Sequence, residues 1–133
     1  MATPVFEAST ARALVRVMAG LGIAVGALLF VLKAPGPFTL STHLFVLWLV
    51  LPWLVALALT LRDHLRGLLT AAALMAGFEV FAFYTTFLAP RGSTSALLYA
   101  VKPVWQLGLM GLSLLAAFVF DHLRRRAPRK DSV

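Results

Sequence analysis

Residues 68–89 read LLTAAALMAGFEVFAFYTTFLA, an apolar run that contains a single acidic residue, Glu79. A helix that crosses a bilayer needs about 20 mostly apolar residues, because about 30 Å of hydrocarbon is covered at about 1.5 Å per residue. This run is long enough for one crossing, and it lacks the polar stripe of a soluble amphipathic helix. The stretch therefore predicts a transmembrane helix with a carboxyl group near its middle.

Three further apolar runs of similar length accompany this one, at 13–32, 44–61 and 96–120. Strands of a β-barrel would alternate polar and apolar residues over short segments, and none of the runs does so. Helices are then the only spanning structure that leaves no backbone group unpaired in lipid. We predict an all-α, integral membrane four-helix transmembrane bundle that forms one domain over residues 1–133, with a basic tail at 121–133.

The composition of the whole chain excludes a soluble globular domain. Of its 133 residues, 61% are hydrophobic and 13% are charged, and the mean hydropathy is +0.91. Soluble domains have about 45–50% apolar and about 25% charged residues, and so short a chain could not bury this much apolar surface in one core. The chain has no cysteine, which excludes disulfides, thiolate metal sites and a cysteine nucleophile.

The basic residues lie unevenly across the predicted loops. One side holds nine of the 12 Lys and Arg residues: Arg12, Arg16, Arg62, Arg66, Arg124, Arg125, Arg126, Arg129 and Lys130. Cytoplasmic loops of membrane proteins carry an excess of Lys and Arg, so we expect both termini and the 62–67 loop to face the cytoplasm. Arginine outnumbers lysine nine to three, which favours a GC-rich bacterial genome and hence the bacterial cytoplasmic membrane.

The net charge of +7 indicates the orientation of the chain in the membrane and contact with lipid headgroups. Arg124, Arg125 and Arg126 follow the last apolar run, so we expect them to bind anionic lipid headgroups at the membrane surface. The lipid bilayer is thus the first expected partner. No nucleic-acid partner is expected, because the basic residues lie at the ends of spans and form no separate domain.

The tetrapeptide Asp-His-Leu-Arg occurs twice, at 63–66 after the second run and at 121–124 after the fourth. A duplicated helical hairpin would place one copy at each of two equivalent helix ends. The alternative is that helix C-termini at a basic interface simply favour Arg and His, whose charge suits the helix dipole. Both interpretations stay open at the level of sequence.

Glu79 is the main candidate for a functional residue. A charged side chain at mid-membrane costs about 2.5 kcal/mol or more, so Glu79 should face protein or a water-filled cavity. Counting residues inward from the outer ends of the third and fourth runs places Gln106 at a similar depth and Lys102 closer to the surface. We therefore expect Gln106 to be the direct partner, and Lys102 to extend outward and to join only through water. Thr86 shares the Glu79 face and can hydrogen-bond across a helix interface.

This intramembrane polar group has two interpretations. It is either a proton- or cation-binding site, or a hydrogen-bonded acid that serves helix packing alone. Gly22 and Gly26 form a GxxxG pattern that permits close contact between helices, either within the chain or in a homodimer. Pro52 and Pro103 each remove a backbone hydrogen bond and should loosen or kink their helices.

Catalytic chemistry has no candidate residues in this sequence. The chain contains no HExxH motif, no pair of histidines at metal-ligand spacing, no GxSxG motif and no glycine loop for phosphate. No catalytic residue, metal site or cofactor is therefore expected.

The architecture resembles that of the small multidrug resistance transporters, which have four short spans and one membrane-embedded glutamate. That family carries its glutamate in the first helix, whereas this chain has no acidic residue between Glu7 and Asp63. The resemblance is therefore one of architecture, which does not by itself assign a function.

The sequence is compatible with two functions. The first is a small non-enzymatic membrane protein that acts as an accessory or assembly partner of a larger membrane complex. The alternative is a small proton-coupled transporter or channel that uses Glu79 as its coupling site. A homodimer is compatible with either function.

Overall fold

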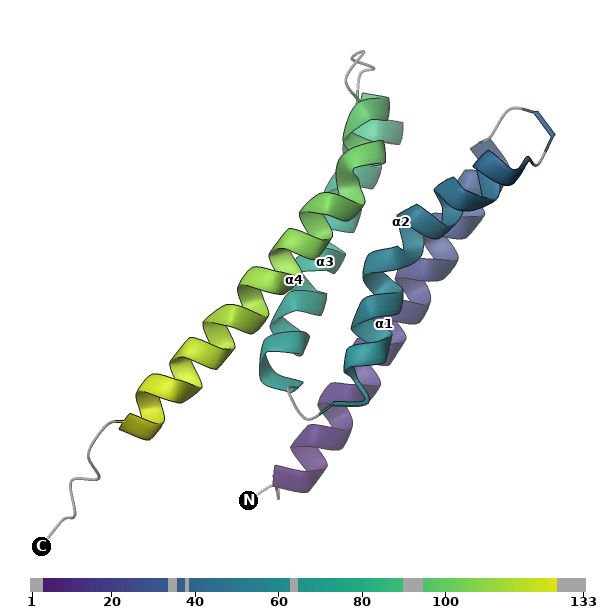
Figure 1. Ribbon diagram of the computed structural model, residues 1–133. Coiled ribbons are helices and arrows are strands. Elements are labelled where there is room, and N and C mark those ends of the chain that lie inside the picture. The colour runs from purple at the N-terminus through teal and green to yellow at the C-terminus, as the bar shows by residue number, and fades with distance from the viewer. Residues whose placement is uncertain (1–3, 34–35, 38, 63–64, 90–94, 127–133) are drawn as a thin grey trace, which may run out of the picture.

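The computed structural model describes residues 4–33, 36–37, 39–62, 65–89 and 95–126 (Figure 1). Within these residues the chain forms four long helices and one short turn of π-helix: α1 (Pro4–Lys33), α2 (Leu40–Leu59), α3 (Leu65–Phe83), η1 (Tyr84–Leu88) and α4 (Ser95–Arg126). All four helices are long and apolar enough to cross a membrane, over Ala8–Leu32, Leu40–Leu59, Gly67–Leu88 and Leu97–Arg126. The prediction of an all-α fold with four helices is thus confirmed, and each of the four helices is long and apolar enough for one crossing of a multi-pass membrane protein.

The helices match the predicted runs in number and order but differ from them at several ends. α1 starts before Ala13, and α4 continues past Phe120 to Arg126. Hydropathy detects the apolar part of a helix, whereas the backbone helix continues through good helix formers such as arginine. The positive charges in the last turn of α4 also interact favourably with the negative end of the helix dipole. Part of the predicted basic tail is therefore helical.

The first turn of α2 is set by a capping box. The Thr39 hydroxyl accepts a hydrogen bond from the Thr42 backbone N–H at 3.4 Å, and the Thr42 hydroxyl accepts one from the Thr39 N–H at 3.3 Å. This exchange satisfies two backbone donors that would otherwise be unpaired at a helix start. It places the start of α2 at Leu40, earlier than the apolar run suggested.

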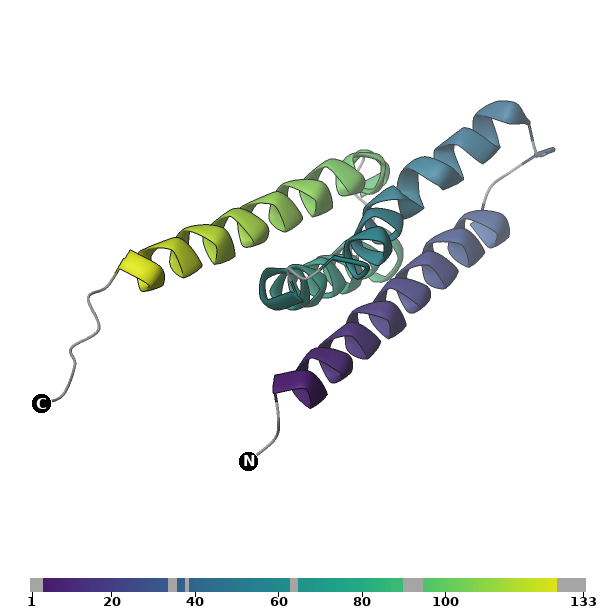
Figure 2. The same ribbon diagram turned by 60° about the horizontal axis from the view of Figure 1, so that its bottom comes forward.

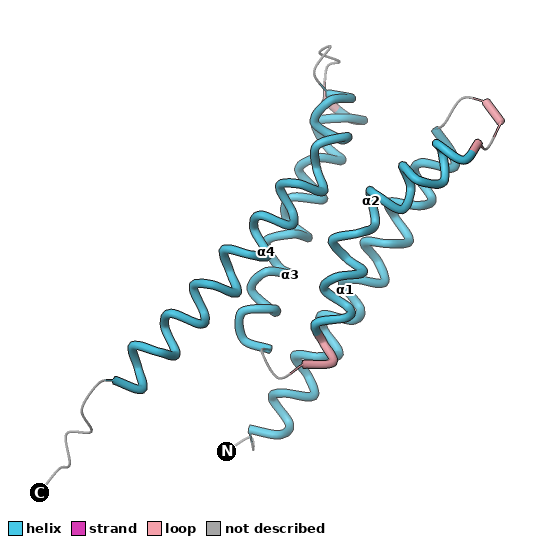
Figure 3. Tube along the Cα trace, in the orientation of Figure 1, coloured by secondary structure: helices cyan, strands magenta, loops and turns pink. Residues whose placement is uncertain are grey.

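The four helices form two hairpins, α1–α2 and α3–α4 (Figures 1 and 3). α3 packs chiefly on α4 and also on α1, while α2 packs on α1 and α4. The described parts of α1 and α4 make no contact with each other, and Figure 2 shows them on opposite sides of α3. The start of α1 and the end of α4 lie at the same end of the molecule as the α2–α3 connection (Figure 1). We call this the connection end, and the assignment of this end to the cytoplasm stays a prediction from charge.

A small apolar core lies between the hairpins. It contains Val15, Ala19, Trp53, Ala56, Leu68, Ala71, Ala72, Met75 and Met110. Four of these residues are alanines, which let helix backbones approach closely. Most other large apolar side chains point outward, and α4 is the least buried of the four spans. Outward apolar faces of this kind suit a chain whose solvent is hydrocarbon.

Two glycines mark the closest approaches between helices. A Cβ on Gly22 would overlap the indole ring of Trp53, so α1 and α2 could not pack as they do with any other residue there. A Cβ on Gly67 would lie 2.8 Å from the Ala117 Cβ, where α3 crosses α4. Gly26 is less constrained, because its Cβ would lie 3.7 Å from Val50 Cγ1, an ordinary contact. The GxxxG pattern therefore faces α2 of the same chain.

The repeated tetrapeptide does not occupy equivalent places in the two hairpins. Residues 121–124 lie within α4, whereas α2 ends at Leu59, before the first copy is reached. Asp63 and His64 of that first copy lie outside the described residues. The duplication of a helical hairpin stays a prediction.

Candidate functional site

Glu79 lies four residues before the end of α3 and near the middle of the candidate span Gly67–Leu88, and its side chain points into the bundle. It is 8% exposed, while its neighbour Val80 on the outward face is 69% exposed. Nine residues separate Glu79 from Leu88 at the end of η1, which corresponds to about 14 Å along the helix. The carboxylate is therefore held well inside the predicted membrane span.

Three side chains from two other helices donate hydrogen bonds to this carboxylate. Lys102 Nζ lies 2.6 Å from Glu79 Oε1, and Gln106 Nε2 lies 2.8 Å from Glu79 Oε2. Trp53 Nε1, from α2, lies 3.3 Å from Glu79 Oε2. Lys102 and Gln106 are fully buried, and Trp53 is 1% exposed. We call these four residues the polar cluster; it connects α2, α3 and α4.

The structure agrees with one expected contact and contradicts the other. The hydrogen bond expected between Glu79 and Gln106 is present. The expectation that Lys102 extends outward and reaches Glu79 only through water is wrong, because the ammonium binds the carboxylate directly. Counting depth along the helices compares Cα positions only, and the long lysine side chain can span a difference of one turn. Opposite charges attract each other more strongly in a medium of low dielectric constant than in water, which favours the direct contact.

Gln106 has a defined orientation within the polar cluster. Its Nε2 donates to Glu79 Oε2 and, at 3.4 Å, to the backbone carbonyl of Met75. Both neighbours are acceptors, so the amide must present its NH₂ group to them. The Oε1 atom then faces away and is buried, without a hydrogen-bond partner among the described residues.

Tyr99 lies beside the polar cluster, one turn before Lys102 on α4. Lys102 Nζ lies over the tyrosine ring, 4.8 Å from its centroid, a geometry that attracts a cation to the ring face. The Tyr99 hydroxyl is buried and, like Gln106 Oε1, has no hydrogen-bond partner in the part of the chain that the structure describes. On its other side the ring makes an edge contact with Phe87 of η1, at 5.8 Å between centroids.

Trp53 is the member of the polar cluster that sequence reasoning missed. In the sequence Trp53 is one of many apolar residues of the run at 44–61. Tryptophan is usually found at membrane interfaces, where its N–H can reach water or headgroups. A tryptophan in the middle of a span, directly after a proline, was therefore the available signal that its N–H must find an acceptor inside the protein.

Each of the three helices carries a feature near the polar cluster that alters the regular backbone hydrogen bonding of an α-helix. Buried Pro52 directly precedes Trp53, and buried Pro103 directly follows Lys102. Each proline removes one hydrogen bond from its helix and leaves one carbonyl without its usual donor. On α3 the π-helical turn η1 follows Phe83, and π-turns are frequently found at functional sites.

Thr86, the fourth residue predicted for this polar site, lies in η1. It is half-buried and about 10 Å further along the helix axis than Glu79, since seven residues separate the two. Its participation in the site stays a prediction.

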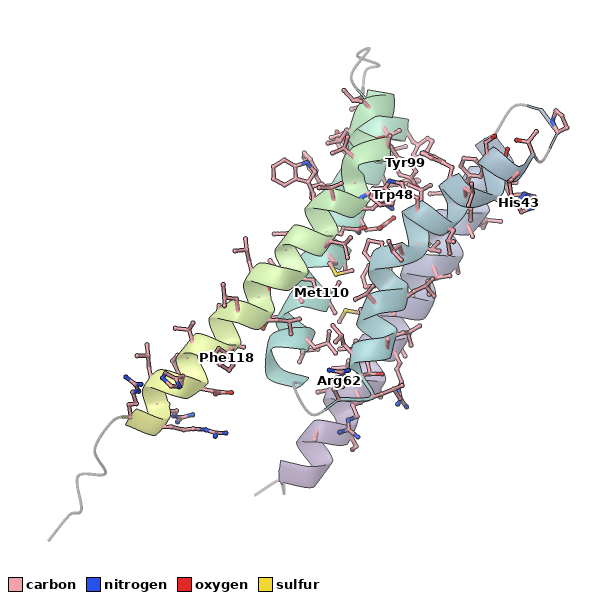
Figure 4. All side chains as sticks on the ribbon, viewed as in Figure 1. His43, Trp48, Arg62, Tyr99, Met110 and Phe118 are labelled. Carbon is pink, nitrogen blue, oxygen red and sulfur yellow. The ribbon has the colours of Figure 1, made fainter. Side chains whose placement is uncertain are left out.

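The predicted headgroup-binding arginines lie far from the polar cluster. Arg124, Arg125 and Arg126 form the exposed last turn of α4. In Figure 4, Phe118 lies low on α4 toward this end, whereas Tyr99 and Trp48 lie high between the two hairpins. The Arg124 guanidinium lies over the Phe120 ring, 6.0 Å from its centroid. All three arginines are exposed, and their contact with anionic lipid stays a prediction.

The chemistry available to the polar cluster is limited. It contains one carboxylate and one ammonium, so its net charge is zero when both are ionised. No group of three or more His, Asp or Glu side chains that could hold a metal ion is found among the described residues. The cluster can hold helices together or bind and release a proton, but it offers no activated nucleophile.

Comparison with known proteins identifies no relative. The chain matches no family model, no curated protein and no solved structure.

Proposed function

We propose that this protein is a small, non-enzymatic accessory or assembly partner within a larger complex of the bacterial cytoplasmic membrane. The observation that carries the proposal is the state of Glu79. Its two oxygens accept hydrogen bonds from three side chains, and its charge is balanced by Lys102 at 2.6 Å. A carboxylate held in this way favours a structural role, because it joins α2, α3 and α4 and leaves little capacity for a solute.

The outer surface of α4 supports the same proposal. α4 is the least buried span, and its outward side chains include Val104, Trp105 and Leu112, each more than half exposed. Gly108, on the same side, would have no atom within 4 Å of an added Cβ. Nothing within the described chain requires a glycine there. This face is available to another transmembrane helix.

Isolation in mild detergent tests the proposal. The protein, tagged at one end and expressed at its native level, is expected to copurify with a membrane partner in a constant ratio. The double variant Glu79→Gln/Lys102→Met replaces the ion pair with neutral groups of similar size and should keep that partner if the folded bundle is retained. A protein that purifies alone and that moves a solute after reconstitution would contradict the assembly role.

A small proton-coupled transporter or channel is the second candidate, and the backbone near Glu79 favours it. Pro52 and Pro103 each remove one backbone hydrogen bond from α2 and α4, and η1 continues α3 as a π-helical turn, so all three features lie near Glu79. If the protein carries protons, Glu79→Gln in reconstituted vesicles should abolish flux driven by a pH gradient. Flux that is unchanged in this variant would remove Glu79 from any such mechanism.

A further inference from the structure

The polar cluster and Tyr99 hold more hydrogen-bonding capacity than their own contacts use. The Lys102 ammonium has three N–H donors, and the described residues provide it with one acceptor, Glu79 Oε1. The Tyr99 hydroxyl and Gln106 Oε1 are buried without partners in the same residues. Donors and acceptors are thus both left over in one small region inside the bundle.

These leftover groups are grouped along one face of α4. Tyr99 precedes Lys102 by three residues and Gln106 follows it by four, so the three side chains share a face of the helix. The Tyr99 ring is in direct contact range of the ammonium, at 4.8 Å. The unpartnered hydroxyl thus belongs to a side chain in contact with the Lys102 ammonium, and the unpartnered amide oxygen belongs to the next residue along the same face of α4.

The chemistry of these groups selects a neutral ligand. Glu79 and Lys102 already balance each other, so an additional ion would leave a net charge inside the membrane, which is costly. The ligand must both donate and accept hydrogen bonds, since N–H and O–H donors and two acceptor oxygens are available. It must also be small, because every one of these side chains is at least nine-tenths buried.

We infer that the bundle binds water inside the membrane, at the Lys102 ammonium, the Tyr99 hydroxyl and Gln106 Oε1. Buried waters in proteins typically make about three hydrogen bonds to polar groups that would otherwise be unsatisfied. An unsatisfied buried hydroxyl or amide oxygen carries the full cost of its desolvation, and bound water removes that cost.

Replacing Tyr99 by phenylalanine tests this inference through stability. Tyr99→Phe keeps the ring beneath Lys102 and removes only the hydroxyl. If the hydroxyl binds water, the variant should unfold at a lower temperature in lipid nanodiscs, by about 3 °C. If the hydroxyl is unsatisfied, its removal should leave the melting temperature unchanged or raise it, and that result would overturn the inference. Tyr84→Phe is the matched control, because Tyr84 is 57% exposed and its variant should melt like the wild type.

A second measurement detects the water directly. In nanodiscs, magnetisation transfer from water should reach the indole N–H of Trp53, which is hydrogen-bonded to Glu79 Oε2, the same oxygen that Gln106 binds. Trp105 provides a control within the same molecule, since it is next to Gln106 in sequence but 59% exposed on the outward face of α4. We expect a water signal at Trp53 and none at Trp105. A Trp53 indole as dry as that of Trp105 would overturn the inference.

This inference does not depend on the assembly role. Bound water would remain compatible with a structural cluster, whereas a proton-carrying role requires it as a path to Glu79. The copurification and flux experiments can therefore both fail while the water measurements succeed, and copurification can succeed while the water measurements fail.

Discussion

The two hairpins of this bundle are held together by different kinds of contact. In α1–α2, the key contact is close packing: the Trp53 indole lies against Gly22, where no side chain is in its way. In α3–α4, it is one of charge, the ion pair of Glu79 and Lys102. Trp53 connects the two hairpins, because the indole that packs on Gly22 also donates a hydrogen bond to Glu79 Oε2.

This difference shows how a bundle of this composition can be specified in lipid. Hydrocarbon solvates apolar side chains as well as another helix does, so burial of apolar surface does not drive helices together. Helices in lipid are therefore held together by close packing at small residues and by hydrogen bonds or ion pairs between polar side chains. α1–α2 uses the first and α3–α4 chiefly the second, which leads to different expectations for substitutions in each.

The largest effect is expected from breaking the ion pair. Lys102→Met leaves the Glu79 carboxylate buried with Gln106 and Trp53 but without its counter-charge. Removing one member of a buried pair costs about 3–5 kcal/mol, so the free energy of unfolding in mixed micelles should fall by that order. The double variant Glu79→Gln/Lys102→Met should recover much of the loss, because it leaves no unpaired charge. A double variant as unstable as the single one would mean that packing, and not charge, dominates in α3–α4.

A smaller but clear effect is expected in the hairpin held by close packing. The Cβ of Gly22→Ala would overlap the Trp53 indole and force the ring or the helix to move, at a cost of about 1–3 kcal/mol. The shift should also weaken the bond from Trp53 to Glu79, which a change in tryptophan fluorescence would report. Gly20→Ala is the control, because its Cβ would have no atom within 4 Å. Equal stability of the two variants would contradict the role assigned to Gly22.

The comparison also explains what could be predicted from the sequence. Membrane thickness sets the length of an apolar run, so the number and order of the helices follow from hydropathy. The contact of Glu79 with Gln106 follows from depth, because the two lie on neighbouring helices of one hairpin joined by a short loop. Trp53 belongs to the other hairpin, and residue counting gives no register between hairpins. The direct contact of Lys102 with Glu79 could not be predicted in this way, because counting residues ignores the length of the lysine side chain.

A third substitution, Gly67→Ala, tests whether close packing also stabilises α3–α4. The Cβ of Gly67→Ala would lie 2.8 Å from Ala117 Cβ and 3.2 Å from the Ser113 carbonyl oxygen. We expect it to destabilise the bundle by about 1–2 kcal/mol, at the low end of the range for overpacking, since α4 has few other contacts near the connection end and can shift. Thermal unfolding of Gly67→Ala beside Gly77→Ala, whose Cβ would meet no atom within 4 Å, measures the difference. Indistinguishable melting curves would confine close packing to α1–α2.

The smallest effect is expected at a second side-chain hydrogen bond between the hairpins, in which Trp48 Nε1 donates to the carbonyl oxygen of Ala100 at 3.0 Å. Hydrogen bonds between membrane helices average about 0.6 kcal/mol, because the separated helices find other partners for the same groups. Trp48→Phe should therefore lower the free energy of unfolding by about that amount. Trp105→Phe, on the outward face of α4, removes an indole with no such contact and should have no effect. A loss at Trp48 as large as that at Lys102 would contradict the small contribution expected of a single hydrogen bond between these helices.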